Sequence, residues 1–169
     1  MKLNLASGQD YKDGYINIDN ESMYSGAMRV DVNADVLTLD WEENVVEEII
    51  LSHFAMYISL QEMQPLLEKW CGWLKDGGRI LIESGNLKSI CRNILESNDP
   101  YIINGDNGVK QLFGWESTAG HKWCWCPETL SPLLYNAGFS DVKVATENFP
   151  KENFFHKNPS RDFFMIGIK

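Results

Sequence analysis

The chain has 169 residues, of which 44% are apolar, and carries a formal net charge of −9. A chain of this length is expected to fold as one domain, over residues 1–169, with a sizeable buried core. Its lysines and arginines are scattered, so the basic surface that nucleic acids require is missing, and no apolar run approaches the ~20 residues of a membrane span. Met1 and Lys2 lead directly into a predicted strand instead of a signal-peptide core, so we expect a cytoplasmic protein without nucleic-acid or membrane partners.

Apolar alternation and β-branched residues predict strands throughout the chain. They are expected near residues 2–6, 15–19, 29–33, 48–52, 79–84, 141–147 and 162–168.

Helices are predicted between several of these strands. The clearest begins at the capping pair Ser59 and Glu62 and ends before Gly77, and two more are expected over about 86–96 and from Pro127 to Gly138. Alternation of strands and helices predicts a mostly parallel sheet with helices on its faces. Sheets of this kind bind ligands beyond the carboxyl ends of their strands.

Residues 97–126 form a long stretch without a clear strand or helix pattern. This stretch is rich in Asn, Asp and Gly, yet it contains the aromatic residues Tyr101, Phe113, Trp115, Trp123 and Trp125. Long loops inside compact domains are usually functional, which predicts a variable cap or a substrate-binding wall. Aromatic side chains that seal one end of the core are an equally good interpretation.

The motif HKWCWC, at residues 121–126, contains His and Cys side chains that zinc prefers. It offers three ligands on a tight stretch with no obvious fourth, so packing of small thiols beside tryptophans is the better interpretation. The chain's cysteines show no disulfide pattern and are expected to be free thiols.

Residues 3–20, LNLASGQDYKDGYINIDN, contain two predicted strands joined by a short link. If the first strand is central, Ala6, Ser7 and Gly8 form the turn at its carboxyl end, where small residues let a ligand approach the backbone. Asp19 ends the next strand, where an acid can accept hydrogen bonds from both hydroxyls of a ribose. Only 11 residues separate Gly8 from Asp19, against the usual ~20, so the first crossover helix must be abbreviated to a turn or two.

This abbreviated pattern resembles the short form of the class I S-adenosylmethionine-dependent methyltransferases, of the methyltransferase type 11 kind. The similarity continues in five further segments, DVLTLDW, EEIILSHF, LLEKWCGWLKDGGRILIE, LSPLLYNAGF and RDFFMIGIK. It implies an α/β, Rossmann-like fold with a seven-stranded, mostly parallel sheet, an antiparallel edge strand and helices on both faces. It also implies S-adenosyl-L-methionine as the cofactor.

The resemblance assigns expected contacts along the cofactor. They are Ala6, Ser7 and Gly8 at the methionine part, Asp19 at the ribose, Asp35 and Val36 at the adenine, and Ser52 and His53 near the transferable methyl group.

The chain departs from the family pattern after the fourth strand. Family members often have SHVLEH there, whereas this chain has SHFAMY, with Met56 and Tyr57 where an acid and a histidine are common. The resemblance implies methyl transfer, and the departure leaves a noncatalytic S-adenosylmethionine-binding protein as the alternative. A nicotinamide-dependent Rossmann enzyme is disfavoured because the motif GxGxxG is absent.

The acceptor is expected to be a small molecule or a saccharide, methylated on oxygen or nitrogen. The motif [DN]PP[YFW] of enzymes that methylate amino groups of nucleic acids is missing after the fourth strand. The acidic net charge also disfavours a nucleic-acid acceptor. His121 is the first candidate for a general base, followed by Tyr57 and His53. No metal site is predicted, because metal-assisted deprotonation needs clustered carboxylates and the motif NGDNG, at residues 104–108, lacks the downstream glutamate of a calcium loop. A monomer or homodimer is expected.

Overall fold

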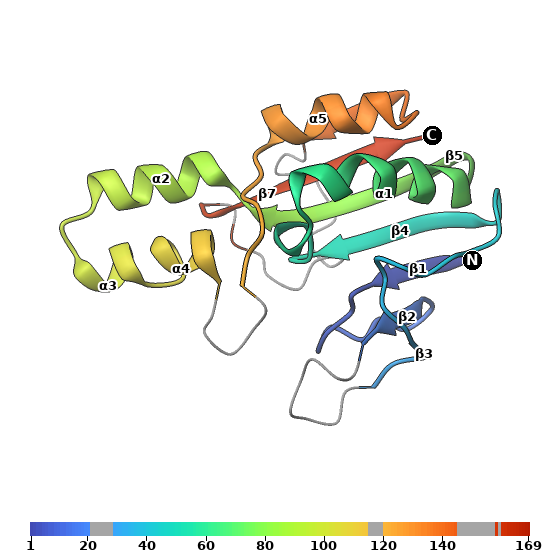
Figure 1. The fold of residues 1–169 in the computed structure, drawn as a ribbon, viewed down its shortest axis with the longest axis horizontal. Coiled ribbons are helices and arrows are strands. Elements are labelled where there is room, and N and C mark those ends of the chain that lie inside the picture. Colours follow the sequence, from blue (N-terminus) through green and yellow to red (C-terminus); the bar gives the residue numbers. More distant parts are fainter. Residues whose placement is uncertain (21–28, 115–119, 145–157, 159) are drawn as a thin grey trace.

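The computed structural model describes residues 1–20, 29–114, 120–144, 158 and 160–169. Its strands form a seven-stranded sheet in the order β3-β2-β1-β4-β5-β7-β6 (Figure 1). The strands are β1 (Lys2–Leu5), β2 (Ile16–Asp19), β3 (Val32–Asn33), β4 (Val46–Ser52), β5 (Leu74–Gly85), β6 (Asp141–Val144) and β7 (Asp162–Ile168). Strands β1 to β5 pair in parallel, and β7 runs antiparallel to both β5 and the edge strand β6. The predicted Rossmann-like fold class is therefore confirmed.

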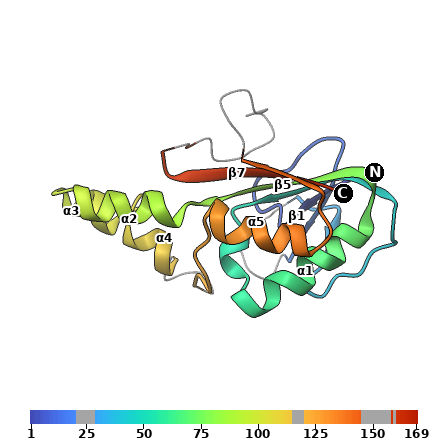
Figure 2. The same cartoon turned by 90° about the horizontal axis from the view of Figure 1, so that it is seen from above.

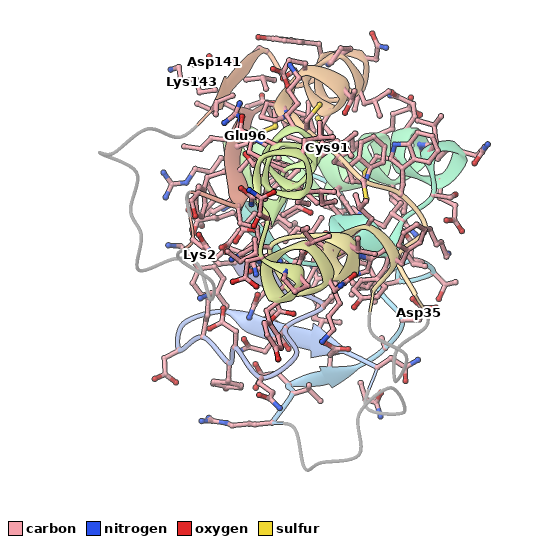
Figure 3. The ribbon with its side chains drawn as sticks, turned by 90° about the vertical axis from the view of Figure 1, so that its left-hand side faces the viewer. Lys2, Asp35, Cys91, Glu96, Asp141 and Lys143 are labelled. Carbon is pink, nitrogen blue, oxygen red and sulfur yellow. The ribbon has the colours of Figure 1, made fainter. Side chains whose placement is uncertain are left out.

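The described helices fall into two groups. Helices α1 (Leu60–Trp73) and α5 (Pro127–Asn136) lie on the same face of the sheet (Figure 2). Helices α2 (Leu87–Glu96), α3 (Pro100–Asn104) and α4 (Val109–Phe113) extend beyond the carboxyl end of β5 (Figure 1). Figure 3 looks at this second group end on, with Cys91 and Glu96 marking α2. Among the described residues, no helix is long and apolar enough to cross a membrane.

Helix α1 begins where the capping pair predicts. The Ser59 hydroxyl accepts a hydrogen bond from the Glu62 N–H, and the Glu62 carboxylate accepts one from the Ser59 N–H. The helix ends at Trp73, before the predicted stop at Gly77, because Leu74 already pairs with Val46 in the sheet. Strand pairing thus overrides the glycine signal at this end.

The core lies between the sheet and the two helices α1 and α5. Its largest fully buried side chains are Trp70, Trp73, Trp125 and Phe139. By contrast, Tyr101 is 88% exposed and Phe113 is 71% exposed. The aromatic residues of segment 97–126 therefore divide between core packing and exposed surface.

The link between β1 and β2 contains turns and no helix, so the prediction of a shortened crossover helix was wrong in this detail. Two buried asparagines, Asn4 and Asn17, sit opposite each other in the register of these strands. The Asn4 amide donates to the carbonyl of Asp10 and to the side-chain oxygen of Asn17, whose own amide donates to the carbonyl of Lys12. These bonds hold the link against the sheet in place of a packed helix.

The prediction that residues 97–126 lack regular structure was also wrong, because α3 and α4 lie there. The Asp99 carboxylate caps α3 by accepting from the Tyr101 N–H at 2.8 Å, with Pro100 in the first turn. Each helix has only five residues, so its formation depends on packing more than on a sequence pattern. Trp115 lies outside the described residues, as do positions 145–147 of the predicted sixth strand.

Candidate functional site

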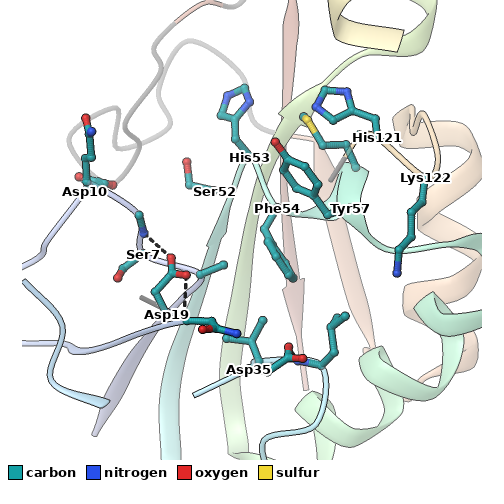
Figure 4. Close-up of a pocket in the computed structure, with 18 of the residues that line it drawn as sticks. Ser7, Asp10, Asp19, Asp35, Ser52, His53, Phe54, Tyr57, His121 and Lys122 are labelled. Atoms are coloured by element: carbon teal, nitrogen blue, oxygen red, sulfur yellow. Dashed lines mark hydrogen bonds between the residues drawn. The ribbon is translucent and has the colours of Figure 1, made fainter. Parts of the chain in front are cut away.

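A cavity of about 790 Å³ opens at the carboxyl ends of β1, β2 and β4 (Figure 4). It is lined by every residue that the sequence analysis assigned to the site: Ala6, Ser7, Gly8, Asp19, Asp35, Val36, Ser52, His53, Tyr57 and His121. In the view of Figure 4, Asp19 and Asp35 lie at one end, and His53, Tyr57 and His121 lie at the other. The cavity is large enough for a ligand of cofactor size.

The turn after β1 adopts a left-handed backbone conformation at two positions. The φ angle is +52° at Ala6 and +53° at Gly8. A Cβ atom at Gly8 would meet nothing within 4 Å, so the glycine is favoured there by its backbone angle and not by lack of space. Ala6 adopts the same conformation with a Cβ atom, which costs an L residue about 1–2 kcal/mol.

Asp19 connects the end of β2 to this turn. Its Oδ2 accepts a hydrogen bond of 2.6 Å from the Gly8 N–H, and its Oδ1 accepts one of 2.6 Å from the Asn20 N–H. Burial raises the pKa of Asp19, and the two backbone N–H donors offset part of this rise. Each carboxylate oxygen keeps a second acceptor position, so the side chain can still receive hydroxyl groups from the cavity.

Asp35 and Val36 follow β3 along the cavity wall. The Asp35 Oδ1 accepts from the Leu37 N–H at 2.9 Å, and its carbonyl accepts from the N–H groups of Thr38 and Leu39. Asp35 is exposed and Val36 is buried. Asp35 therefore stabilises its own loop, whatever it contributes to ligand binding.

The 3₁₀ helix Ala55–Tyr57 forms part of the opposite wall. The carbonyl of Met56 accepts hydrogen bonds from the N–H groups of Lys122 and Trp123, and the carbonyl of Ala55 accepts one from Trp125 Nε1 at 2.9 Å. The HKWCWC motif thus holds this turn in place. Within the described part of the chain, its histidine and cysteines do not assemble into a group that could ligate a metal.

His121, the first candidate for a general base, is held by two contacts of its ring. Its Nδ1 lies 2.8 Å from the carbonyl oxygen of Gln111, and its ring packs edge to face against Tyr57 with 5.1 Å between ring centroids. A carbonyl can only accept, so this bond places the proton on Nδ1 and leaves Nε2 to take one. Burial lowers the pKa of His121, which favours the neutral form that a base requires.

His53 lies in a different electrostatic setting. Its Nε2 is 3.4 Å from Glu83 Oε1 and 3.3 Å from Asp162 Oδ2, and Arg161 Nε donates to Asp162 Oδ1 at 2.6 Å. Burial lowers the pKa of His53, but the two carboxylates outweigh burial and raise it overall. This makes His53 a weaker base candidate than His121.

Three residues near His53 were not predicted from the sequence: Glu83, Arg161 and Asp162. Glu83 follows the apolar run of residues 80–82 in β5, and an acid within such a buried stretch is a signal that could have marked it. Arg161, just before β7, and Asp162, its first residue, form an adjacent ion pair that gives no sign of its distant partners.

Comparisons with solved structures show that the fold is similar to that of known methyltransferases. No protein-family model matches the chain, and no curated protein matches its sequence. Among solved structures, it is similar to a SAM-dependent methyltransferase from Archaeoglobus fulgidus, with 20% identity and a TM-score of 0.61 over 99% of this chain and 85% of that one. It is also similar to an S-adenosylmethionine-dependent methyltransferase from Mesorhizobium loti, with 13% identity and a TM-score of 0.62 over 99% of this chain and 90% of that one.

A third similar structure is human N-acetylserotonin methyltransferase in complex with SAM, at 16% identity and a TM-score of 0.58. The alignment covers 99% of this chain but only 47% of the human one, so the chain spans about half the length of that protein. These likenesses confirm the predicted resemblance at the level of the fold. The chain has the class I S-adenosylmethionine-dependent methyltransferase fold.

Proposed function

We propose that this protein transfers a methyl group from S-adenosyl-L-methionine to an oxygen or nitrogen of a small-molecule or saccharide acceptor. The observation that carries the proposal is the cavity, which gathers the predicted cofactor contacts at one end and His121 with Tyr57 at the other. The fold it shares with solved methyltransferases supports the choice of cofactor.

The cofactor end offers a distinct partner for each part of the ligand. The left-handed turn at Ala6 and Gly8 lets the methionine part approach the backbone, and Asp19 offers carboxylate oxygens to the ribose. Asp35 and Val36 line the part of the cavity that the adenine would occupy. Ser52 and His53, at the end of β4, then face the methyl group.

Methyl transfer from a sulfonium is a direct displacement, so aligning the acceptor, methyl carbon and sulfur and excluding water provide most of the acceleration. For a hydroxyl acceptor, His121 Nε2 takes the proton as the oxygen attacks the methyl carbon. The carbon–sulfur bond breaks, and its electron pair stays on sulfur. A positioned base contributes about 10²- to 10⁴-fold.

Calorimetry with S-adenosylhomocysteine tests the cofactor part of the proposal. Asp19→Ala removes charge-assisted hydrogen bonds worth about 1.5–3 kcal/mol, so the affinity should fall roughly ten- to hundredfold. Asp10→Ala is the matched control, because Asp10 lines the same cavity and pairs with Lys12. Its binding should stay close to that of the wild type.

Equal affinity in a folded Asp19→Ala variant and the wild type would show that β2 does not end at the ribose. Cofactor binding without turnover of any small-molecule or saccharide acceptor would favour the noncatalytic alternative.

A further inference from the structure

We propose that His53, Glu83 and Asp162 form a binding site for a zinc ion beside the acceptor end of the cavity. Their ligand atoms, one nitrogen and two carboxylate oxygens, all lie within 4.8 Å of one another. This donor set suits zinc, which binds imidazole and carboxylate groups in sites with three protein ligands.

The sheet brings these ligands together from distant parts of the sequence. Strands β4, β5 and β7 are neighbours, and His53 follows β4, Glu83 lies in β5 and Asp162 begins β7. The His53 N–H donates to the Glu83 carbonyl at 2.9 Å, which fixes the end of β4 against β5. The site therefore rests on regular sheet pairing and not on loops.

The distances within the cluster match the spacing of donor atoms around a shared metal ion. His53 Nε2 is 3.4 Å from Glu83 Oε1 and 3.3 Å from Asp162 Oδ2. Two ligands about 2.05 Å from a zinc ion, at a tetrahedral angle, are separated by about 3.3–3.4 Å.

Burial makes the carboxylates dependent on a positive partner. The side chains of Glu83 and Asp162 are 0% exposed, and Glu83 Oε1 faces His53 Nε2 at 3.4 Å. The other oxygen of Glu83 accepts from the Ser52 hydroxyl at 3.0 Å, and Asp162 accepts two bonds from Arg161. Ser52 and Arg161 thus orient the two carboxylates, as hydrogen-bond partners of metal ligands usually do.

The backbone at His53 supports a positioned ligand. Its φ angle is +51°, a left-handed conformation that costs a residue with a side chain free energy and that tends to occur at functional sites. His53 and Arg161 both line the cavity, so a molecule in the cavity can reach the coordination position that the protein leaves open.

The proposed role of the ion rests on the proposed methyl transfer. An acceptor oxygen bound to zinc has a lowered pKa, so it loses its proton more readily to His121 Nε2 before it attacks the methyl carbon. The carbon–sulfur bond then breaks and sulfur keeps the electron pair, as in the reaction without the ion.

The test measures metal binding alone, so it is independent of cofactor and acceptor. Protein freed of metal by a chelator is titrated with Co²⁺, whose visible absorption reports its coordination, and the bound Co²⁺ is then displaced with Zn²⁺. We expect one ion per chain, and Glu83→Gln and His53→Asn should each weaken binding more than about tenfold. Asn is chosen at position 53 because it tolerates a positive φ angle.

The controls are His121→Gln and Cys124→Ser, which probe the alternative zinc ligands in HKWCWC. Both should bind Co²⁺ as the wild type does, without the near-ultraviolet charge-transfer band of a cobalt–thiolate bond. The proposal is overturned if the wild type binds no ion, if the control variants lose binding, or if a thiolate band appears. It is also overturned if folded Glu83→Gln and His53→Asn keep wild-type affinity. Absence of metal binding with intact S-adenosylhomocysteine binding would refute the zinc site alone and leave the proposed function standing.

Discussion

Replacing Ala6 by glycine tests whether the turn after β1 stores backbone strain at the cofactor end of the cavity. Ala6 has a φ angle of +52°, so glycine should relieve about 1–2 kcal/mol of left-handed strain. Against this, glycine costs roughly 0.5–1 kcal/mol in backbone entropy, and loss of a half-buried methyl group costs at most about 0.8 kcal/mol. The terms nearly cancel, so Ala6→Gly should leave the free energy of unfolding within about 1 kcal/mol of the wild type.

Ala137→Gly is the matched control for this substitution. Ala137 follows α5 with a φ angle of −78° and is 9% exposed, so glycine relieves no strain there. The control should lose about 1–2 kcal/mol through entropy and the missing methyl group. The difference between the two variants, about 1–2 kcal/mol, is the strain at Ala6.

Urea denaturation without ligand measures both variants, since the midpoint and slope give the free energy of unfolding. A difference of 1 kcal/mol also corresponds to roughly 2–4 °C in melting temperature for a chain of this size. If Ala6→Gly lost as much stability as Ala137→Gly, the turn would carry no strain, and the argument from its backbone angle would be wrong.

Two further predictions concern the rest of the cavity. Asp35→Ala should lower both the melting temperature and the affinity for S-adenosylhomocysteine. Asp35→Asn keeps an acceptor for the Leu37 N–H, so its melting temperature and affinity should fall less. Equal losses for the two variants, in melting and in calorimetry, would count against Asp35 as a stabiliser of its loop and as an adenine contact. The rate of methyl transfer should rise with pH as His121 becomes neutral, with its midpoint below the ordinary value of about 6.5 because burial lowers this pKa. His121→Gln should remove that inflection while leaving cofactor affinity unchanged, and an identical pH profile would exclude His121 as the base.

Much of the cavity wall at β1 and β2 could be predicted because its signals are local. The turn at Gly8 and the acid at Asp19 end neighbouring strands, and the carboxyl ends of parallel strands meet at one edge of a sheet. The capping pair at Ser59 and Glu62 likewise predicted the start of α1, because a cap involves only residues near it in sequence.

The missed features depend on contacts between distant segments. His53, Glu83 and Asp162 meet only because β7 inserts beside β5, and no spacing in the sequence encodes that pairing. Glu83 and Asp162 were therefore not predicted as neighbours of His53. The five-residue helices α3 and α4 were missed for a similar reason, since helices so short are stabilised by packing.

A crystal structure of the protein with S-adenosylhomocysteine tests the central claim most directly. The account predicts the ribose hydroxyls within hydrogen-bond distance of Asp19, the adenine beside Asp35 and Val36, and the sulfur directed toward Ser52 and His53. A ligand bound outside this cavity, or bound within it with the ribose away from Asp19, would contradict the account.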